Sequence, residues 1–381
     1  MARTALVLGA GIGGISVAHA LRKRLPADDR VVVVERERNH VFAPALLWHA
    51  VGDSEPADFT RPIAALAATG IELVSGDISR IDASAVAVQV GAKTWSGDAM
   101  IVALGADYAP EVVPGLAECG LNLYTLAGAG QIRAALDRFD GGRIVVLTAA
   151  PAYKCPAAPY EAAMLVEAFC RKRGLRGKTQ IALHAAEPAP MPVAGPVAGA
   201  QIRTMLERKG IAYFPQRQVE RVEDGVLHFA EGQTAPFDLL LYVPPHRAPA
   251  VVKEAGLCGE SGWVPVDRTT LATKFPKVWA IGDVTSIPLK MGRPLPKAGV
   301  FAGGQAEVVA KNIAAAWTGQ AATAGFNGHG ACFLEVGGGM AGMGSGNFYA
   351  EPLPDVRMRT PNPFWHLGKI LHQKFWLWRQ F

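Results

Sequence analysis

Near its N-terminus the chain reads Ala5-Leu6-Val7-Leu8-Gly9-Ala10-Gly11-Ile12-Gly13-Gly14, in which a short apolar run is followed by closely spaced glycines. The apolar run is typical of a buried parallel strand, and the glycines match the spacing G-x-G-x-x-G. A helix is predicted over 15–24 and a second strand over 31–34, ending in Glu35. In such a unit the glycines make the tight turn, admit a pyrophosphate and let helix pack on strand. The acid accepts a ribose hydroxyl, so these features predict a dinucleotide-binding unit.

Length and composition set the outer limits of the architecture. A chain of 381 residues exceeds the size at which single cores stop growing, about 250–300 residues, so two α/β lobes and an appendage are expected. The sequence lacks the run of about 18 apolar residues that spans a membrane. Residues 1–4 run directly into a strand, which indicates no signal peptide. The net charge of +5 does not indicate nucleic-acid binding. The scattered cysteines show no metal-ligand spacing.

Two later strands indicate which dinucleotide is bound. One is predicted over 99–105 and ends in an Ala-x-Gly turn, and the other is predicted over 277–283 and ends in Gly282-Asp283. Either segment alone is compatible with an ordinary buried strand. Both together, in this order behind the glycine motif, resemble the two-dinucleotide-domain flavoproteins of the glutathione-reductase type. In that superfamily the aspartate bonds the ribityl chain of FAD, and the Ala-x-Gly turn lies against the same cofactor.

The resemblance implies FAD as the cofactor and a division of this α/β chain into two Rossmann-like lobes and a tail. We expect an FAD lobe over 1–105, resumed over 265–320, and a degenerate second Rossmann lobe over 106–264. Residues 321–381 are expected to close the flavin pocket and to contact a membrane. The residues expected to hold FAD are Gly9, Gly11, Gly14, Glu35, Arg36, Pro44, Ala103, Gly105, Gly282, Asp283, Lys297 and Gly299.

The second lobe lacks the glycine turn against which the pyrophosphate of a nicotinamide dinucleotide would bind. Its first strand is predicted over 143–147, and the segment 148–161 that follows contains no glycine. Three prolines in this segment remove amide donors and stiffen the approach. NAD(P)H is therefore not expected to be the electron donor.

Cys155 stands in this segment, at the carboxyl end of a strand, where open α/β sheets carry their chemistry. The N-terminus of the next helix and the adjacent Lys154 could lower the pKa of its thiol. From position alone, a small buried thiol without chemistry is an equally good interpretation of Cys155. For Cys119, Cys170 and Cys258 the buried thiol is the preferred interpretation.

A further set of motifs resembles the sulfide:quinone oxidoreductases, and is also similar to the flavin subunit of flavocytochrome c sulfide dehydrogenase. The resemblance runs over essentially the whole chain, and the paired cysteines are its most specific element. The residues that carry it are Cys155, Pro159, Tyr160, Glu161, Leu295-Pro296-Lys297-Ala298-Gly299-Val300-Phe301 and Ala331-Cys332-Phe333.

The resemblance implies a redox disulfide between Cys155 and Cys332 beside the flavin. Hydrosulfide would attack it, giving a persulfide on one cysteine and a thiolate on the other. Electrons would pass to FAD, and a second attack would release zero-valent sulfur as polysulfide. Glu161 is a candidate proton acceptor, although a helix-capping or solvated carboxylate is an equally good interpretation. Phe301 and Phe333 are candidates for the approach of a quinone.

Two features depart from the pattern of that family. Many of its quinone reductases carry a third cysteine ahead of Cys155, in the segment that here reads Leu123-Tyr124-Thr125-Leu126. Tyr124 or a neighbour stands in its place. The loop around 191–196 also lacks a histidine that some members have. The resemblance therefore leaves the route of sulfur release open.

The C-terminal segment combines positive charge with an apolar helical stripe. No acid follows Asp355, and a helix is predicted over 364–381. Trp365 and Trp376 add aromatic bulk suited to a headgroup boundary. A basic amphipathic helix of this kind is typical of a segment that lies on a membrane, and the alternative is a helix docked on the body or on a second subunit. The stripe, at spacing i, i+3, i+7, i+11 and i+14, consists of Phe364, Leu367, Leu371, Phe375 and Trp378.

This tail favours a membrane quinone as the electron acceptor. The flavocytochrome alternative needs a cysteine for covalent flavin attachment, and residues 40–45 contain none, so FAD should be non-covalent. We expect an enzyme that oxidises sulfide, reduces quinone and lies peripherally on a membrane, with the cytoplasmic side favoured. Transfer to a cytochrome c, a type II NADH:quinone oxidoreductase and a flavoprotein without turnover are the alternatives. A homo-oligomer is compatible with the sequence.

Overall fold

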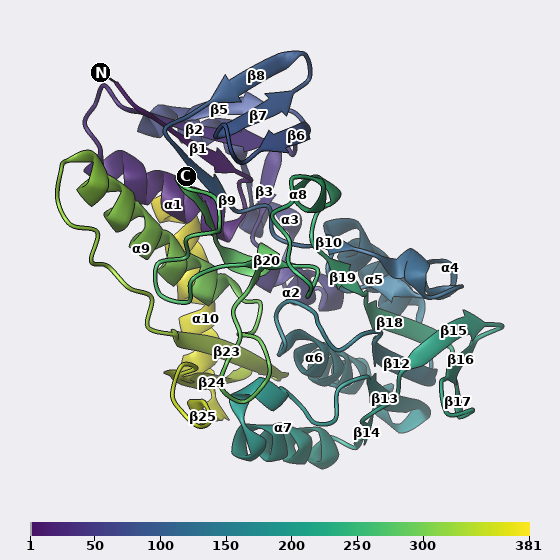
Figure 1. Cartoon of the computed structure of the whole chain (residues 1–381). Helices are drawn as coiled ribbons and strands as arrows, with labels where there is room; N and C mark the ends of the chain where they lie inside the picture. The colour runs from purple at the N-terminus through teal and green to yellow at the C-terminus, as the bar shows by residue number, and fades with distance from the viewer. Residues whose placement is uncertain (1) are drawn as a thin grey trace.

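The computed structural model describes residues 2–381 and contains two five-stranded parallel sheets, one in each lobe (Figure 1). In the first lobe every neighbouring pair of strands is parallel. Helix α1 (Ile12–Arg24) connects β1 to β2, so the predicted dinucleotide-binding unit is present. In spatial order the strands are β21 (Val278–Ala280), β9 (Ala99–Val102), β1 (Thr4–Leu8), β2 (Arg30–Glu35) and β5 (Glu72–Ser75).

Alternate side chains of these strands enter two different cores, because successive residues of a strand point to opposite faces. Ala5 and Val7 pack with α1 and with α9 (Gly299–Trp317). Leu6 and Leu8 pack on the other face with an antiparallel sheet. Burial on both faces explains why the strands are continuously apolar. That antiparallel sheet consists of β6 (Ile78–Asp82), β7 (Ala87–Val90) and β8 (Lys93–Ser96).

The second lobe repeats this architecture. Its sheet is parallel throughout, with the strand order β11 (Leu121–Asn122), β18 (Leu239–Val243), β12 (Gly142–Thr148), β13 (Thr179–Ala185) and β14 (Ile211–Phe214). One face shares a core with α5 (Leu126–Arg138), α6 (Ala158–Lys172) and α7 (Pro196–Arg208). The other face is covered by β15 (Val219–Glu223), β16 (Val226–Phe229) and β17 (Thr234–Pro236).

The C-terminal part is an antiparallel sheet followed by a helix. The sheet consists of β23 (His329–Gly337), β24 (Met340–Asn347) and β25 (Asp355–Asn362), and the helix is α10 (Pro363–Gln380). β23 packs against α6 of the second lobe and α9 of the first, and α10 runs from this sheet to α1 (Figure 1). The tail therefore contacts both lobes. Within residues 2–381, none of the helices combines the length and the apolarity that crossing a membrane requires.

Helix α9 begins at Gly299, although glycine has low intrinsic helix propensity. It packs on α1, and this tertiary contact outweighs propensity.

Short elements complete the chain. Of these, α2 packs between α5 and α6. The short helices are α2 (Leu46–Val51), α3 (Pro56–Phe59), α4 (Leu116–Cys119) and α8 (Ala250–Glu254). The paired short strands are β3 (Asn39–Val41) with β4 (Thr60–Pro62), β10 (Asp107–Tyr108) with β19 (His246–Arg247), and β20 (Val264–Pro265) with β22 (Thr285–Ser286).

Candidate active site

The glycine loop between β1 and α1 has the shape that a pyrophosphate needs. Gly9 has a φ of +96°, and a Cβ on Gly14 would stand 1.8 Å from the Gly9 carbonyl oxygen, so both positions require glycine. A Cβ on Gly11 would meet nothing within 4 Å, which leaves open space at the start of α1. These are the three roles that the motif assigns to its glycines.

Glu35 is held beside this loop at the end of β2. One carboxylate oxygen accepts a hydrogen bond from the Ala10 N–H at 2.6 Å. The other accepts from the Arg36 and Glu37 N–H groups at 2.8 and 2.9 Å. The acid therefore lies where a ribose hydroxyl would reach it.

The two other predicted cofactor segments are adjacent to the glycine loop. A Cβ on Gly9 would stand 2.8 Å from the Ala103 carbonyl oxygen, so the turn after β9 lies against the loop. β21 pairs with β9 and brings Gly282 to the same edge of the sheet. Gly105 and Gly282 have φ values of +69° and +73°, which glycine adopts without steric cost.

Asp283 carries a buried oxygen that needs a donor. Its Oδ1 has no hydrogen-bond partner among residues 2–381, and an unsatisfied buried oxygen is destabilising. Burial raises the pKa of Asp283, and the positive charges of Lys154 and Lys297 oppose this effect. The hydroxyl groups of a ribityl chain would satisfy the oxygen, so this residue fits FAD.

Lys297 joins the cofactor side to the cysteine loop. Its Nζ donates to the carbonyl oxygens of Asp283 and Thr285 at 2.7 and 2.9 Å, and lies 3.4 Å from the centre of the Trp263 ring. Its own carbonyl oxygen accepts the Cys155 N–H at 2.7 Å. Burial lowers the pKa of Lys297 to about 8.

Three further predicted residues lie around these segments. Arg36 is exposed and pairs with acidic neighbours. Pro44 lies in a short 3-10 helix before α2. Gly299 begins α9, and a Cβ there would stand 2.7 Å from the side chain of Ile12 at the start of α1. Gly299 therefore permits the close approach of the two helices.

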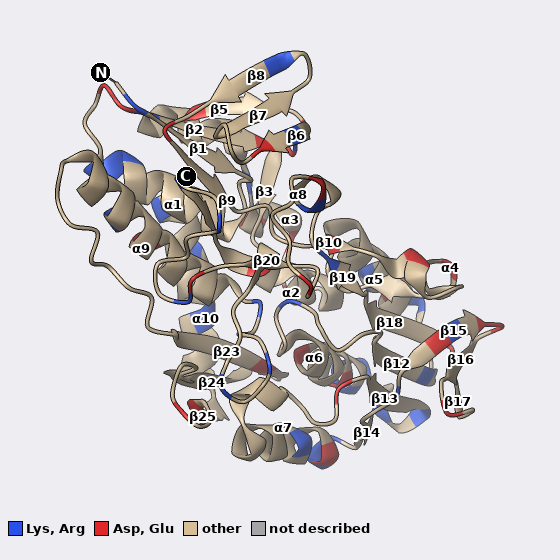
Figure 2. Cartoon of the chain, viewed as in Figure 1, with Lys and Arg blue, Asp and Glu red and all other residues tan. Residues whose placement is uncertain are grey.

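The two predicted redox cysteines line one cavity of about 640 Å³. Its wall is formed by the Cys155 loop, the segments 191–194 and 291–298, and the C-terminal sheet. The wall is mainly apolar, and β24 carries no charged residue (Figure 2). Neither cysteine is in a disulfide in this structure. Phe301 and Phe333 line the same cavity.

Both thiols hold their protons more tightly than a free cysteine does. Burial, reinforced by the negative charges of Cys332 and Glu161, raises the pKa of Cys155 far above its usual value. Burial and the Glu161 carboxylate raise the pKa of Cys332 to about 11, although this residue is exposed toward the cavity. The predicted lowering of the Cys155 pKa is therefore wrong: the Ala158 backbone at the start of α6 and the Lys369 ammonium lower it, but burial outweighs both.

A buried charge cluster adjoins the thiols. Glu161, in the first turn of α6, accepts hydrogen bonds from Lys369 Nζ at 2.9 Å and from the Glu335 N–H at 2.8 Å. His366 Nδ1 lies 3.0 Å from Glu335 Oε2, and Lys369 Nζ lies 3.9 Å from Glu335 Oε1. Glu161 and Glu335 are 3% and 1% exposed. The interpretation of Glu161 as a solvated carboxylate is therefore wrong.

The cluster and the thiols influence one another by charge. The Lys369 ammonium lowers the pKa of both cysteines, against the larger effect of burial. Burial opposes the charged form of Lys369, but the carboxylates of Glu161 and Glu335 outweigh it and raise the pKa of the lysine. Lys369 belongs to α10, so the C-terminal helix contributes to the site. Sequence reasoning missed Lys369, Glu335 and His366, because a lysine on a basic amphipathic helix normally faces solvent.

Helix α10 has its apolar stripe on the outside. The predicted stripe residues Phe364, Leu367, Leu371, Phe375 and Trp378 are between 51% and 82% exposed. The opposite face is buried and largely polar, with Lys369, Gln373 and Gln380. Trp376 packs inward on His40 and Phe42, with ring centroids at 5.0 and 5.2 Å. The predicted position of Trp376 at a headgroup boundary is therefore wrong. The face of α10 that docks on the body is the one opposite the apolar stripe.

The other cysteines stand apart from the cavity. Cys170 is buried as predicted, and Cys258 is half-buried. Cys119 is exposed, so its prediction as a buried thiol is wrong. It ends the short helix α4, whose last turn reaches the surface.

The turn after β12 is filled by side chains of the chain itself. Glu187 is 2% exposed and accepts hydrogen bonds from the hydroxyls of Thr148 and Tyr160, both at 2.7 Å, and of Tyr153. It follows β13 as Glu35 ends β2, the position at which a dinucleotide-binding lobe offers an acid to a ribose. The tyrosine hydroxyls stand where ribose hydroxyls would bind, and this agrees with the glycine-free sequence of the turn.

A comparison with known proteins identifies the family. The model of the pyridine nucleotide-disulphide oxidoreductases matches residues 3–306. The chain belongs to this family.

Relatives of this pyridine nucleotide-disulphide oxidoreductase include sulfide:quinone oxidoreductases and type II NADH:quinone oxidoreductases. The mitochondrial sulfide:quinone oxidoreductase of Mus musculus is 26% identical, over 91% of this chain and 79% of that protein. The X-ray structure of the sulfide:quinone oxidoreductase from Aquifex aeolicus matches with a TM-score of 0.89 and 23% identity, over 100% of this chain and 91% of that one. A type II NADH:quinone oxidoreductase of Staphylococcus haemolyticus is 23% identical, over 84% of this chain and 83% of that protein.

These findings confirm the predicted α/β flavoprotein fold, the FAD cofactor and the resemblance to sulfide:quinone oxidoreductases. The glycine loop, Glu35 and the unsatisfied oxygen of Asp283 fit FAD independently, because each offers what one part of the cofactor needs.

The glycine loop gives a first prediction. Gly14→Ala should leave less than about a tenth of the bound FAD, because its Cβ would overlap the Gly9 carbonyl oxygen and displace the loop. The flavin absorbance per protein measures the effect. Gly177→Ala is the matched control, since its Cβ would meet nothing within 4 Å. Full FAD content in Gly14→Ala would contradict the assigned geometry.

Proposed function

We propose that this chain oxidises sulfide to zero-valent sulfur and passes the electrons through FAD to a membrane quinone. The observation that carries the proposal is the shared cavity of Cys155 and Cys332, joined to the cofactor side by Lys297. The sulfide:quinone oxidoreductase names of the mouse and Aquifex relatives agree with this chemistry.

The division of labour in the proposal follows the two lobes. Residues 1–105 and 265–320 would hold FAD, residues 106–264 would carry Cys155, and residues 321–381 would supply Cys332 and Lys369. Bound FAD would supply the acceptor that takes two electrons from the reduced cysteine pair and passes them to a quinone. The flavin would be held by the residues that the sequence predicts, and the geometry of Gly9, Gly11, Gly14, Glu35 and Asp283 supports this assignment.

In the oxidised chain, Cys155 and Cys332 would form a disulfide. Hydrosulfide attacks one sulfur, a new sulfur–sulfur bond forms, and the old one breaks. One cysteine becomes a persulfide and the other a thiolate, so atoms and charge balance. A second hydrosulfide attacking the outer persulfide sulfur would release that sulfur as disulfide anion, the shortest polysulfide.

Glu161 would accept protons from the sulfur chemistry. The raised pKa values of Cys155 and Cys332 keep the reduced thiols protonated, so re-forming the disulfide requires a group that accepts their protons. The Glu161 carboxylate is bonded to Lys369, which links it to Glu335 and to the partly exposed His366. This line of polar groups leads from the first turn of α6 to the partly exposed His366 on α10.

Helix α10 would lie on the membrane from which the quinone is drawn. Its apolar stripe is exposed, and the stripe is flanked by the cationic residues Lys374 and Arg379, with no acid after Asp355. Apolar residues beside positive charge bind an anionic membrane surface. Lys369 points inward and takes no part in this contact. The cytoplasmic side of the membrane stays a prediction.

The stripe gives a second prediction. The double variant Leu371→Glu and Phe375→Glu should bind anionic phospholipid vesicles about a hundredfold more weakly, since burying each side chain contributes roughly 1.5 kcal/mol or more. Vesicle co-sedimentation measures the affinity. Val197→Glu, a change at another exposed apolar residue on α7, is the control. Equal binding by all three proteins would contradict the membrane assignment.

The type II NADH:quinone oxidoreductase alternative is disfavoured by the second lobe. Its turn contains three prolines and no glycine, and Glu187 is already bonded by three hydroxyls of the chain. The flavocytochrome alternative is disfavoured by residues 40–45. His40 contacts the Ala10 carbonyl oxygen at 3.0 Å, so this segment adjoins the glycine loop, yet it offers no thiol for covalent attachment.

The third prediction tests the function directly. In anaerobic stopped-flow measurements, sulfide should bleach the flavin absorbance rapidly, and a quinone analogue should restore it. NADH at the same concentration should bleach it at least about 10³-fold more slowly, because the second lobe cannot seat a dinucleotide. Bleaching by NADH with indifference to sulfide would overturn the proposal in favour of the NADH oxidoreductase. Indifference to both donors would favour a flavoprotein without turnover.

A further inference from the structure

The Cys155 loop adopts a backbone conformation that must be held from outside. Cys155 has a φ of +49°, in the left-handed region that side chains other than glycine avoid. Such a conformation persists only where the surrounding structure determines it. The loop precedes α6 and contains no glycine that could relax it.

Three contacts hold this loop. The Cys155 N–H donates to the Lys297 carbonyl oxygen at 2.7 Å, on the cofactor side. The Tyr124 hydroxyl donates to the Lys154 and Cys155 carbonyl oxygens at 2.7 and 3.3 Å. Both contacts act on the main chain at the cysteine itself.

In the third contact, the acid Glu187 accepts hydrogen bonds from residues on both sides of the cysteine. Tyr153 precedes Cys155 in the loop and Tyr160 follows it in the first turn of α6, and both hydroxyls donate to Glu187 Oε1. Glu187 Oε2 accepts from Thr148, the last residue of β12. One carboxylate therefore ties the strand, the loop and the helix together.

The three side chains of this contact are buried, so losing it would be costly. Tyr160 is fully buried, Tyr153 is 8% exposed and Glu187 is 2% exposed. A hydroxyl that loses its acceptor at this depth is left unsatisfied, so the loop would move to find another partner. Glu187 and Tyr153 also line the cavity that contains both cysteines. A movement of the loop would therefore change the position of the Cys155 thiol relative to Cys332.

We propose that Glu187 is a positioning residue that holds Cys155 within reach of Cys332. The acid that a dinucleotide-binding lobe would direct to a ribose is here bonded by hydroxyls of the cysteine loop. The inference rests on the proposed function for the Cys155–Cys332 couple and adds a residue that touches neither sulfur.

The test measures closure of the disulfide in the FAD-loaded protein, without sulfide turnover. The protein is reduced, freed of reductant and mixed with oxidised glutathione, which takes up the two electrons and two protons of the dithiol as two molecules of glutathione. The Cys155–Cys332 peptide is then quantified by mass spectrometry at successive times. Glu187→Leu should close the disulfide at least about tenfold more slowly than the unaltered chain, because the loop loses its common acceptor.

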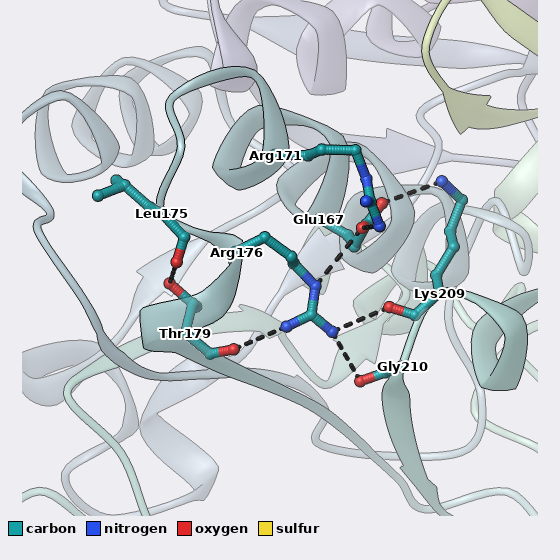
Figure 3. Close-up of polar contacts among 7 residues, drawn as sticks. All are labelled: Glu167, Arg171, Leu175, Arg176, Thr179, Lys209 and Gly210. Carbon is teal, nitrogen blue, oxygen red and sulfur yellow. Dashed lines mark hydrogen bonds and ion pairs between the residues drawn. The ribbon is translucent and has the colours of Figure 1, made fainter.

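The same substitution at another buried acid controls for general destabilisation. Glu167 is fully buried on α6 and is bonded to Arg171, Arg176 and Lys209, away from the cavity (Figure 3). Glu167→Leu should lower the thermal unfolding midpoint yet close the disulfide at the unaltered rate. If both leucine variants slow closure equally, Glu187 has no specific role and the proposal is overturned.

A milder pair of variants keeps the proposal falsifiable if Glu187→Leu does not fold. Tyr153→Phe removes one hydroxyl from Glu187, whereas Tyr349→Phe removes a part-buried hydroxyl that donates to the Arg268 carbonyl oxygen, apart from the Cys155 loop. Only Tyr153→Phe should slow closure. Equal rates in the two would overturn the role of Glu187. Failure of the unaltered chain to form the disulfide would instead overturn the proposed cysteine couple, and the inference with it.

Discussion

Cys155→Ser and Cys332→Ser are each expected to slow the reduction of the flavin by sulfide by about 10³-fold or more, the loss typical of removing a reacting group. A serine hydroxyl occupies nearly the same volume as a thiol, so the cavity should keep its shape. It cannot form the disulfide that hydrosulfide attacks, and it cannot carry a persulfide. Anaerobic stopped-flow with sulfide measures the rate.

The double variant should be no slower than either single variant, because both cysteines act in one bond. Cys119→Ser is the control, since that thiol is exposed outside the cavity. FAD content should be unchanged in all of these variants, which separates loss of chemistry from loss of cofactor. A single variant that retains the unaltered rate would remove that cysteine from the proposed couple.

Lys369→Met is expected to lower the free energy of unfolding by about 3 kcal/mol or more near neutral pH. Methionine fills similar space but leaves the carboxylates of Glu161 and Glu335 buried without their shared cation. Two like charges in a buried site raise one another's pKa and destabilise the folded state. Chemical denaturation followed by flavin and tryptophan fluorescence measures the change.

The loss should depend on pH in a definite direction. Burial already raises the pKa of Glu335, and Lys369 opposes this effect, so removing the lysine should raise it further. A carboxyl with a raised folded-state pKa is neutral in both states at low pH, where the penalty disappears. The penalty grows as the pH rises from the unfolded-state pKa to the folded-state pKa, and it is constant above the latter. The stability gap between Lys369→Met and the unaltered chain should therefore narrow as the pH falls toward about 5.

Lys374→Met provides the matched control, because Lys374 is exposed on the same helix. It should change stability by less than about 0.5 kcal/mol at every pH. A loss in Lys369→Met that is as large at low pH as at neutral pH would contradict the buried charge cluster. It would instead indicate that the lysine contributes by packing alone.

Much of the fold could be predicted because its signals lie in short segments of the sequence. The glycine motif between two apolar runs predicted β1, α1 and β2, and steric limits on Gly9 and Gly14 explain why. The stripe from Phe364 to Trp378 predicted a helix with one apolar face, which α10 has. In each case the signal lies within about four turns or one βαβ unit, and backbone geometry alone relates the residues.

The sequence did not predict which face of a helix packs against the rest of the protein and which is exposed. Helical periodicity by itself places a charged side chain such as Lys369 on the solvent side, yet Lys369 and Gln373 are buried and the apolar side of α10 is exposed. The periodicity of a helix specifies two faces but not their surroundings. The partners Glu161 and Glu335 that make burial of Lys369 favourable stand on α6 and β23.

Local sequence was enough to predict the βαβ unit, the glycine-free second turn and the two cysteines that the resemblance pairs. The packing of distant elements places both cysteines on one cavity, raises their thiol pKa values and lets Glu187 tie the Cys155 loop to β12 and α6. The two kinds of feature differ in the sequence distance between the residues that interact. Backbone sterics and periodicity act between neighbours in the chain, whereas burial and charge pairing depend on which distant elements the packed core brings together.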